Sequence, residues 1–258
     1  MNRNRHRVVM SAARGTFMAV AECARSLGKT STCTATTAAA SLLFCLPLQA
    51  QISADPGAPG TQRPTVLSAP NGVPLVNITT PSAAGVSRNT YRQFDVGSPG
   101  AILNNSRTDV QTQLGGWVQG NPWLASGGAR VILNEVNSNQ PSQLGGYVEV
   151  GGQRAEVVIA NPAGIQVNGG GFINASGVTL TTGTPVMNSG HLDAFRVQGG
   201  SVNIEGLGLD TSTADHTAIL TRAMQVNAGV WAKDLTVVTG SNEVKALASG
   251  ASALSTPI

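Results

Sequence analysis

The stretch AEVVIANPAGIQVNGGGFINASGVTLTTG, residues 155–183, decides the fold. It contains two apolar runs of strand length, residues 157–160 and 178–181, and between them lie an Asn-Pro turn and a three-glycine corner at residues 169–171. Connections of this kind are too short to hold a helix, so the order is strand, sharp turn, strand, corner and strand. This order predicts an all-β chain that folds as a parallel β-helix.

The composition agrees with many short strands closed by tight turns. Only 11% of the 258 residues are charged and 4% are aromatic, whereas glycine and proline number 31 and 13. Asn, Thr, Ser, Gly and Val, which are residues of turns and strands, are abundant after residue 50. A solenoid of this length is ordinarily one domain.

The formal net charge of +3 comes from the start of the chain. Six of the 16 basic residues and one of the 13 acidic residues lie in residues 1–50, which leaves 10 basic and 12 acidic residues in the remainder. The remainder is therefore slightly acidic and has no basic patch in sequence. This distribution argues against nucleic acid as a partner.

Residues 1–50 are predicted to be an extended signal peptide. Residues 38–47, AAASLLFCLP, supply an apolar core that is too short to anchor the chain across a bilayer, and small residues then predict cleavage between Ala50 and Gln51. The basic and apolar extension before this core resembles the extended signal peptides of very large secreted proteins of Gram-negative bacteria. The alternative is an amphipathic helix that is retained on a membrane surface.

All three cysteines lie in this leader, so a chain without it has neither a disulfide nor a reactive thiol; they are Cys23, Cys33 and Cys45. This suits a protein that crosses an oxidising compartment unfolded.

The rest of the chain divides into three parts. Residues 51–74 are rich in Pro and Gly and are predicted to be an extended or mobile lead-in, with order beginning near Leu75. Residues 75–245 are predicted to form the β-helical domain. Residues 246–258 are a low-information tail and the expected point of truncation of a longer protein.

Internal echoes support a solenoid. QLGGWV at residues 113–118 recurs as QLGGYV at 143–148, an offset of 30 residues, and ARVI at 129–132 is echoed by AEVV at 155–158, an offset of 26. A further pair is GFINASGVTLTTG at 171–183 and GVWAKDLTVVTG at 229–240. Self-similarity at periods of about 20–50 residues indicates stacked units that cover one another's apolar faces.

Residues 77–106, NITTPSAAGVSRNTYRQFDVGSPGAILNNS, are similar to the start of a known secretion domain. The resemblance is to two-partner-secreted proteins, the filamentous haemagglutinin and contact-dependent growth-inhibition toxin group. The matching positions are Asn77, Pro81, Ser82, Gly85, Ser87, Asn89, Tyr91, Phe94 and Leu103-Asn104-Asn105-Ser106.

Two Asn-Pro motifs extend the resemblance. Asn161-Pro162-Ala163-Gly164-Ile165 resembles the family's N-P-N-G-I, and Asn121-Pro122-Trp123-Leu124 resembles its N-P-N-L, each with the third residue altered. Physically, Asn can bond the backbone two residues on, Pro presets the second position of a β-turn, and Gly permits a positive φ. Two interpretations are compatible: the turn folds the helix, and it contributes to recognition by an outer-membrane transporter.

The resemblance implies a right-handed parallel β-helix with an N-terminal β cap and strands outside the helix. It further implies a chain that meets a membrane only during export and stays unfolded in the periplasm. There the periplasmic domains of an outer-membrane β-barrel transporter would recognise it, and folding at the cell surface would nucleate the β-helix. The parent protein would be a haemagglutinin-like adhesin or a contact-dependent inhibition toxin, and any contact with a host or neighbouring cell would come through it.

Two rival functions remain open at this point: a self-standing adhesive β-helix that binds host glycan or a cell surface, and a polysaccharide-degrading β-helix enzyme. The latter needs clustered carboxylates, whereas the candidates are scattered without a repeating spacing. No catalytic triad, phosphate loop or zinc spacing is present in sequence, so neither an enzyme nor a cofactor or metal is predicted. The scattered candidates are His191, Asp193, Asp210, Asp215 and His216.

Overall fold

The computed structural model describes residues 6–11, 16–21, 52–246 and 255–258. The chain divides into two compact units, Met1–Cys45 and Leu46–Ile258. In the first unit β1 (His6–Ser11) pairs antiparallel with β2 (Thr16–Ala21), so these two segments are strands rather than parts of a helix. The predicted signal core and the Ala50–Gln51 cleavage site lie outside the described residues.

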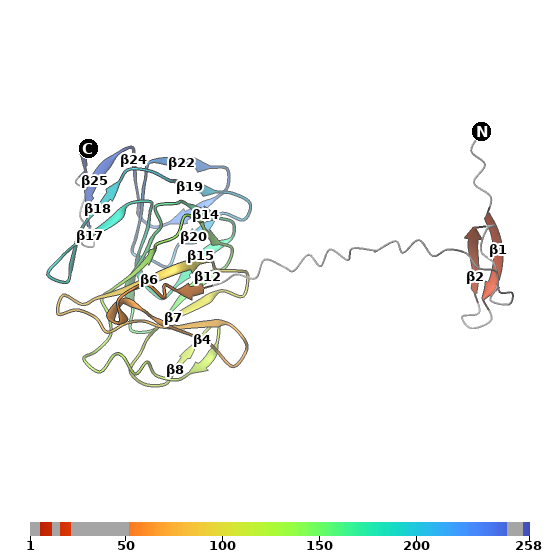
Figure 1. Ribbon diagram of the computed structural model, residues 1–258, viewed down its shortest axis with the longest axis horizontal. Helices are drawn as coiled ribbons and strands as arrows, with labels where there is room; N and C mark the ends of the chain where they lie inside the picture. The colour runs from red at the N-terminus through yellow and green to blue at the C-terminus, as the bar shows by residue number, and fades with distance from the viewer. Residues whose placement is uncertain (1–5, 12–15, 22–51, 247–254) are drawn as a thin grey trace. The chain divides into compact units, whose positions relative to one another are not determined.

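Three parallel sheets form a β-helix in the second unit, and they run in Figure 1 from β4 at one end to β22 and β24 at the other. From β10 to β23 each coil adds one strand to each sheet, whereas the earlier coil with β6 and β7 has no strand in the second sheet. The first sheet contains β6 (Val86–Phe94), β10 (Val131–Val136), β13 (Ala155–Ala160), β16 (Ala175–Thr181), β21 (His216–Thr221) and β24 (Leu235–Thr239). The second contains β11 (Ser142–Leu144), β14 (Ile165–Val167), β19 (Ser201–Ile204) and β22 (Ala223–Val226). The third contains β5 (Pro74–Asn77), β7 (Ala101–Asn105), β12 (Tyr147–Gly152), β15 (Gly170–Ile173), β20 (Leu209–Thr211) and β23 (Val230–Ala232).

The predicted order of strand, turn, strand, corner and strand is confirmed in residues 155–183. It corresponds to β13, the Asn161 turn, β14, a corner at Asn168-Gly169, and then β15 and β16, while Gly170 and Gly171 of the predicted corner belong to β15. Gly169 has a φ of +86° at that corner, a conformation that glycine adopts without strain. Within the described residues, no helix is long and apolar enough to cross a membrane.

The Pro-rich lead-in forms the N-terminal cap, which corrects the prediction that order begins near Leu75. β3 (Ile52–Ala54) pairs antiparallel with β6 and forms the end strand of the first sheet. β4 (Thr65–Ser68) pairs antiparallel with β5 and forms the end strand of the third sheet. A 3₁₀ turn, η1 (Gly60–Gln62), lies between them. The cap tolerates its prolines because four of the five lie outside the strands and Pro74 is the first residue of β5, a strand position that proline can occupy.

Two groups of strands lie outside the helix. β8 (Val110–Thr112) and β9 (Gly116–Val118) form a hairpin. β17 (Thr184–Asn188), β18 (His191–Val197), β25 (Asn242–Lys245) and β26 (Ser255–Pro257) form an antiparallel sheet beside the coils (Figure 1). Part of the low-information tail is therefore a paired strand.

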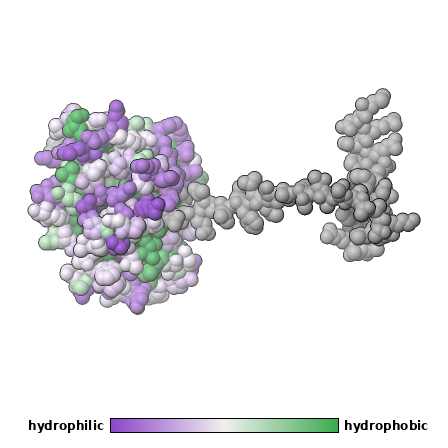
Figure 2. Space-filling view, viewed as in Figure 1, coloured by the Kyte–Doolittle hydropathy of each residue, from purple (hydrophilic) through white to green (hydrophobic). Residues whose placement is uncertain are grey.

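The first sheet is buried on both faces. Val157 and Ile159 of β13 point into the helix interior, whereas Val158 packs outward with Phe195 and Val244 of the antiparallel sheet. Burial on both faces favours continuous apolar runs over strict alternation, and this explains the sequence of β13. The face of the domain in Figure 2 is mostly hydrophilic, with a few separate apolar patches.

The last coil leaves interior positions uncovered. Val237 of β24 is in register with Ile219 and Leu180, which are fully buried, yet Val237 is 44% exposed. Val226 of β22 continues the column of Ile204 in the same way and is 47% exposed. The column of apolar side chains therefore ends in an open apolar face.

The sequence echoes have different structural outcomes. Residues 171–183 and 229–240 occupy equivalent places, because Val178 lies in register with Thr217 and Thr217 with Leu235. The two QLGG copies are not structurally equivalent. The copy at residues 113–116 forms the turn between β8 and β9, and the copy at residues 143–146 connects β11 to β12. The echo between residues 129–132 and 155–158 has an offset of 26 residues in sequence, but the strands pair with an offset of 25, because Ile132 lies opposite Val157. The alternation of inward and outward side chains, rather than residue identity, sets this register.

Replacing Glu149 by alanine is expected to loosen the β8–β9 hairpin. The buried Glu149 carboxylate accepts hydrogen bonds from the backbone N–H groups of Gln113 at 2.7 Å and Leu114 at 2.8 Å. Losing both acceptors should cost about 1–3 kcal/mol. Hydrogen exchange should show roughly tenfold faster exchange of these two amides, with Glu149→Gln intermediate. Unchanged protection would contradict this role.

Candidate functional site

The Asn161 turn joins two strands of one coil, β13 and β14. Asn161 is fully buried, and its Oδ1 accepts a hydrogen bond of 2.9 Å from the N–H of Ala163. Its Nδ2 donates to the carbonyl oxygen of Gln140 at 2.9 Å and to Oγ of Ser142 at 3.0 Å. The Gly164 N–H closes the β-turn on the Asn161 carbonyl at 3.0 Å, and Gly164 has a φ of +123°. The predicted turn geometry is thus confirmed.

The Asn121 corner repeats this arrangement at another place. Oδ1 of the buried Asn121 accepts from the N–H of Trp123 at 3.0 Å. Nδ2 donates to the carbonyl oxygens of Ile78 at 2.9 Å and Asn104 at 3.0 Å. Neither Trp123 nor Ala163 has a positive φ, the backbone conformation that favours Asn. The larger Trp and the smaller Ala therefore fit at the third position, where the family has Asn.

The two motifs present few exposed atoms. Pro122, Trp123 and Pro162 are exposed, with Trp123 at 51%, while Ala163 is half-buried. The Trp123 indole N–H donates to Oγ1 of Thr65 at 3.2 Å, so the cap orients it. The other motif residues are buried: Asn121, Leu124, Asn161, Gly164 and Ile165.

The structure does not bring the two motifs together. The Asn161 turn follows the carboxyl end of β13, whereas the Asn121 corner precedes the amino end of β10, the neighbouring strand of the first sheet. Strands of six residues are about 20 Å long. On the folded domain the motifs therefore form two separate surfaces.

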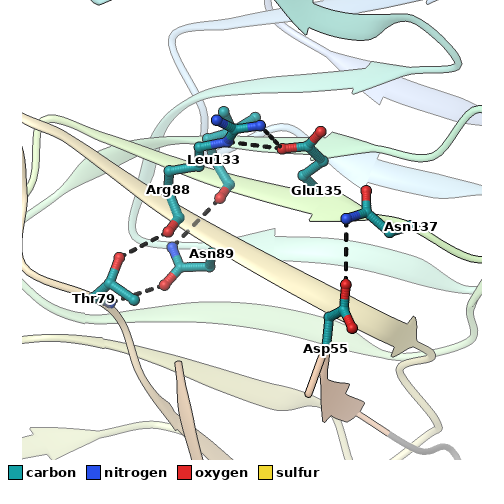
Figure 3. Close-up of polar contacts among 7 residues, drawn as sticks. All are labelled: Asp55, Thr79, Arg88, Asn89, Leu133, Glu135 and Asn137. Carbon is teal, nitrogen blue, oxygen red and sulfur yellow. Dashed lines mark hydrogen bonds and ion pairs between the residues drawn. The ribbon is translucent and has the colours of Figure 1, made fainter. Parts of the chain in front are cut away.

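The signature residues of β6 lie inside the domain. Ser87, Asn89, Tyr91 and Phe94 are all buried. Oδ1 of Asn89 accepts from the N–H of Thr79 at 2.8 Å, a contact drawn in Figure 3. The rings of Tyr91 and Phe94 meet edge to face with centroids 4.9 Å apart, and burial raises the pKa of the Tyr91 hydroxyl. These residues specify the fold rather than an exposed contact.

A second group of signature residues forms a buried amide cluster, which the sequence did not reveal. Nδ2 of Asn104 donates to Oδ1 of Asn77 at 2.8 Å, and the carbonyl oxygen of Asn104 accepts from Asn121. Asn105 donates to the carbonyl oxygen of Ala129 at 2.9 Å and accepts from its N–H at 2.7 Å. Side-chain amides thus replace backbone pairing at the corner after β7.

Polar contacts join the first coils to one another and to the cap, as Figure 3 shows. Between the coils, Nη2 of Arg88 lies 2.8 Å from Oε2 of Glu135, and this ion pair links β6 to β10. Between coil and cap, Nδ2 of Asn137 donates to Oδ2 of Asp55 at 3.4 Å. The Asp55 N–H donates to the carbonyl oxygen of Thr90 at 3.0 Å, so the cap is fixed by backbone and side chain.

The residues weighed for catalysis are dispersed. His191 and Asp193 lie on β18 outside the helix, while Asp210 lies on β20 of the third sheet. Asp215 forms an ion pair with Arg154 at 3.3 Å. Over the described part of the chain, no three His, Cys, Asp or Glu side chains gather as a metal site.

Two family models match the chain. The TPS secretion domain matches residues 50–256, and the Extended Signal Peptide of Type V secretion system matches residues 1–51. Toxin CdiA of Yersinia pestis is 51% identical in an alignment 265 residues long, which covers 95% of this chain and 8% of that protein. tRNA nuclease CdiA-2 of Burkholderia pseudomallei is 45% identical in an alignment 263 residues long, which again covers 95% of this chain and 8% of that protein. The chain thus spans a small part of these relatives' length.

A solved structure agrees with the architecture. The crystal structure of the filamentous hemagglutinin secretion domain matches with a TM-score of 0.69 and 37% identity, over 80% of this chain and 68% of that one. The predicted β-helix and the predicted resemblance are both confirmed. The chain therefore belongs to the TPS secretion domain family and carries an extended signal peptide, so it is exported through the periplasm to the cell surface with a partner outer-membrane transporter.

Proposed function

We propose that the periplasmic domains of the partner transporter bind this chain before it folds, along segments that contain the two Asn-Pro motifs. One observation carries the proposal: five of the nine motif residues, Asn121, Leu124, Asn161, Gly164 and Ile165, are buried in the folded domain. A partner that reads these residues directly must meet them in an extended chain. The wide separation of the motifs in the fold is then no obstacle.

Strand addition is the proposed mode of binding. An extended segment pairs its backbone with a sheet edge, and the affinity comes from main-chain hydrogen bonds. The Asn161 motif lies directly between β13 and β14, and the Asn121 motif lies in the loop between β9 and β10, so each motif has strand-forming sequence on both sides in the chain. The presence of Trp123 and Ala163 at the third positions agrees with recognition that does not require an Asn side chain there.

Folding outside the cell then gives the export its direction. The open face formed by Val226, Val237 and their neighbours is the end of an apolar column, and a further coil would cover it. In a solenoid each unit stabilises the next through their shared interface, so the domain is proposed to template coils of a longer exoprotein. We assign that exoprotein to the contact-dependent inhibition toxins, because the relatives named above are CdiA proteins.

Trp123→Ala is expected to lower secretion several-fold when the chain is co-expressed with its cognate transporter. Trp123 is half-exposed and lies on the surface of the Asn121 corner, so its loss should lower the melting temperature of the domain by no more than a few degrees. Trp117→Ala is the matched control, because Trp117 is 67% exposed on β9 outside both motifs. If the Trp123→Ala and Trp117→Ala variants were secreted equally, the Asn121 corner would not contribute to recognition by the transporter.

A binding assay tests the order of recognition and folding. The purified periplasmic domains of the transporter should bind the secreted domain after it is diluted from denaturant, and binding should vanish as the domain refolds. Equal affinity for the native domain would contradict the proposal.

A further inference from the structure

A groove of about 460 Å³ lies on the outward face of the third sheet. Tyr147 of β12, Asp210 of β20 and Trp231 of β23 line it. In the register of this sheet Tyr147 pairs with Gly171, Gly171 with Asp210, and Asp210 with Trp231. The three side chains therefore form one row across four neighbouring strands, apart from both Asn-Pro motifs.

The two aromatic rings lie directly on glycine backbone. A Cβ on Gly171 would overlap the Tyr147 ring, and a Cβ on Gly229 would lie 2.7 Å from Cη2 of Trp231. No side chain therefore separates either ring from the backbone on which it packs. Tyr147 is 37% exposed and Trp231 is 54% exposed, which leaves two flat apolar surfaces beside the groove.

Asp210 stands between the rings in a fixed orientation. Its Oδ2 accepts from the Tyr147 hydroxyl at 2.9 Å, and its Oδ1 accepts from the N–H of Ser212 at 3.0 Å and from the Ser212 hydroxyl at 2.7 Å. Partial burial raises the pKa of Asp210, but the hydrogen bonds from Ser212 and Tyr147 outweigh it, so the pKa lies below its ordinary value. A carboxylate has about four acceptor sites, so capacity remains for a ligand.

We propose that this groove binds a neutral oligosaccharide. The C–H faces of pyranose rings pack on aromatic faces, and sugar hydroxyls donate to carboxylates. Asp210 would repel phosphate or uronic acid groups, and among the described residues neither Lys nor Arg lines the groove. A peptide strand would need a free sheet edge, whereas β15 and β20 are paired on both sides.

The test uses the domain recovered from the culture medium, with β-1,4-linked glucose and N-acetylglucosamine hexamers as probes. Calorimetry and tryptophan fluorescence should show saturable binding of at least one of them. Trp231→Ala should weaken that binding at least tenfold and Asp210→Asn about fivefold, because they remove a stacking surface and a charged acceptor. Trp117→Ala, on the β8–β9 hairpin, should leave the affinity unchanged.

Several outcomes would overturn the proposal. They are the absence of binding by the parent domain, equal affinity of Trp231→Ala and the parent, and tighter binding of oligogalacturonate than of the neutral hexamers. Lost secretion of Trp231→Ala without saccharide binding by the parent would assign the groove to a protein partner instead. A thermal melt of each variant separates loss of binding from loss of fold, and Asp210→Asn keeps the test valid if Trp231→Ala does not fold.

Discussion

Replacing Gly146 by alanine is expected to destabilise the folded domain severely. Gly146 lies between β11 and β12, where a Cβ would overlap the carbonyl oxygen of Gly97 and lie 2.8 Å from its carbonyl carbon. Both atoms belong to the turn that the Gly100 N–H closes on Gly97 at 2.8 Å. Backbone cannot rotate away as a side chain can, so the cost should reach about 4 kcal/mol or more, a large part of a typical domain's stability of about 5–15 kcal/mol.

Gly116 is the matched control because it holds the same place in the other QLGG copy. A Cβ there would meet nothing within 4 Å, although φ is +67°. Gly116→Ala should therefore cost only about 1–2 kcal/mol, the strain of a left-handed residue. Circular dichroism and thermal melting of the two variants make the comparison. A Gly146→Ala domain that melts within a few degrees of the parent would disprove the backbone clash.

Asn161→Ala and Asn121→Ala are each expected to destabilise the domain by about 2–4 kcal/mol. Each asparagine is buried, and each side chain makes three hydrogen bonds, two as donor and one as acceptor. Alanine would leave carbonyl oxygens and a turn N–H without partners and would open a small cavity. Chemical denaturation of purified variants measures this loss.

Pro162→Ala is the control for the Asn161 turn, because Pro162 is exposed and its side chain fills no core space. It should change the free energy of unfolding by less than about 1 kcal/mol. If Asn161→Ala were as stable as Pro162→Ala, the buried amide would not be what holds the turn. A secretion defect of Asn161→Ala alone would therefore report folding and recognition together, whereas one of Pro162→Ala would report recognition.

Local chemistry made much of the fold predictable. Residues 157–160 and 178–181 are strands in β13 and β16 because their apolar runs and flanking turns are encoded within a few residues. The cap was not predictable in this way. β3 pairs with β6 across a long sequence separation, and composition alone could not show that the edge of the first coil would order a Pro-rich segment.

The same distinction holds for the site. The hydrogen bond from the Ala163 N–H to Oδ1 of Asn161 spans two residues and follows from turn chemistry. The bonds from Asn121 to Ile78 and Asn104 join distant segments, so burial of both asparagines came only with the fold. The row of Tyr147, Asp210 and Trp231 was likewise hidden, because parallel register rather than sequence proximity brings these residues together.

The pairing of β25 with β18 has a mechanical consequence. β25 follows the last coil, yet its partner β18 branches from between β16 and β19 of an earlier coil. A pulling force applied after Lys245 therefore enters β18 through four antiparallel residue pairs, Asn242 to Lys245 against Val197 to Ala194. Tension on the chain is shared with an interior coil, and the exposed end of the solenoid is spared from being peeled away one strand at a time.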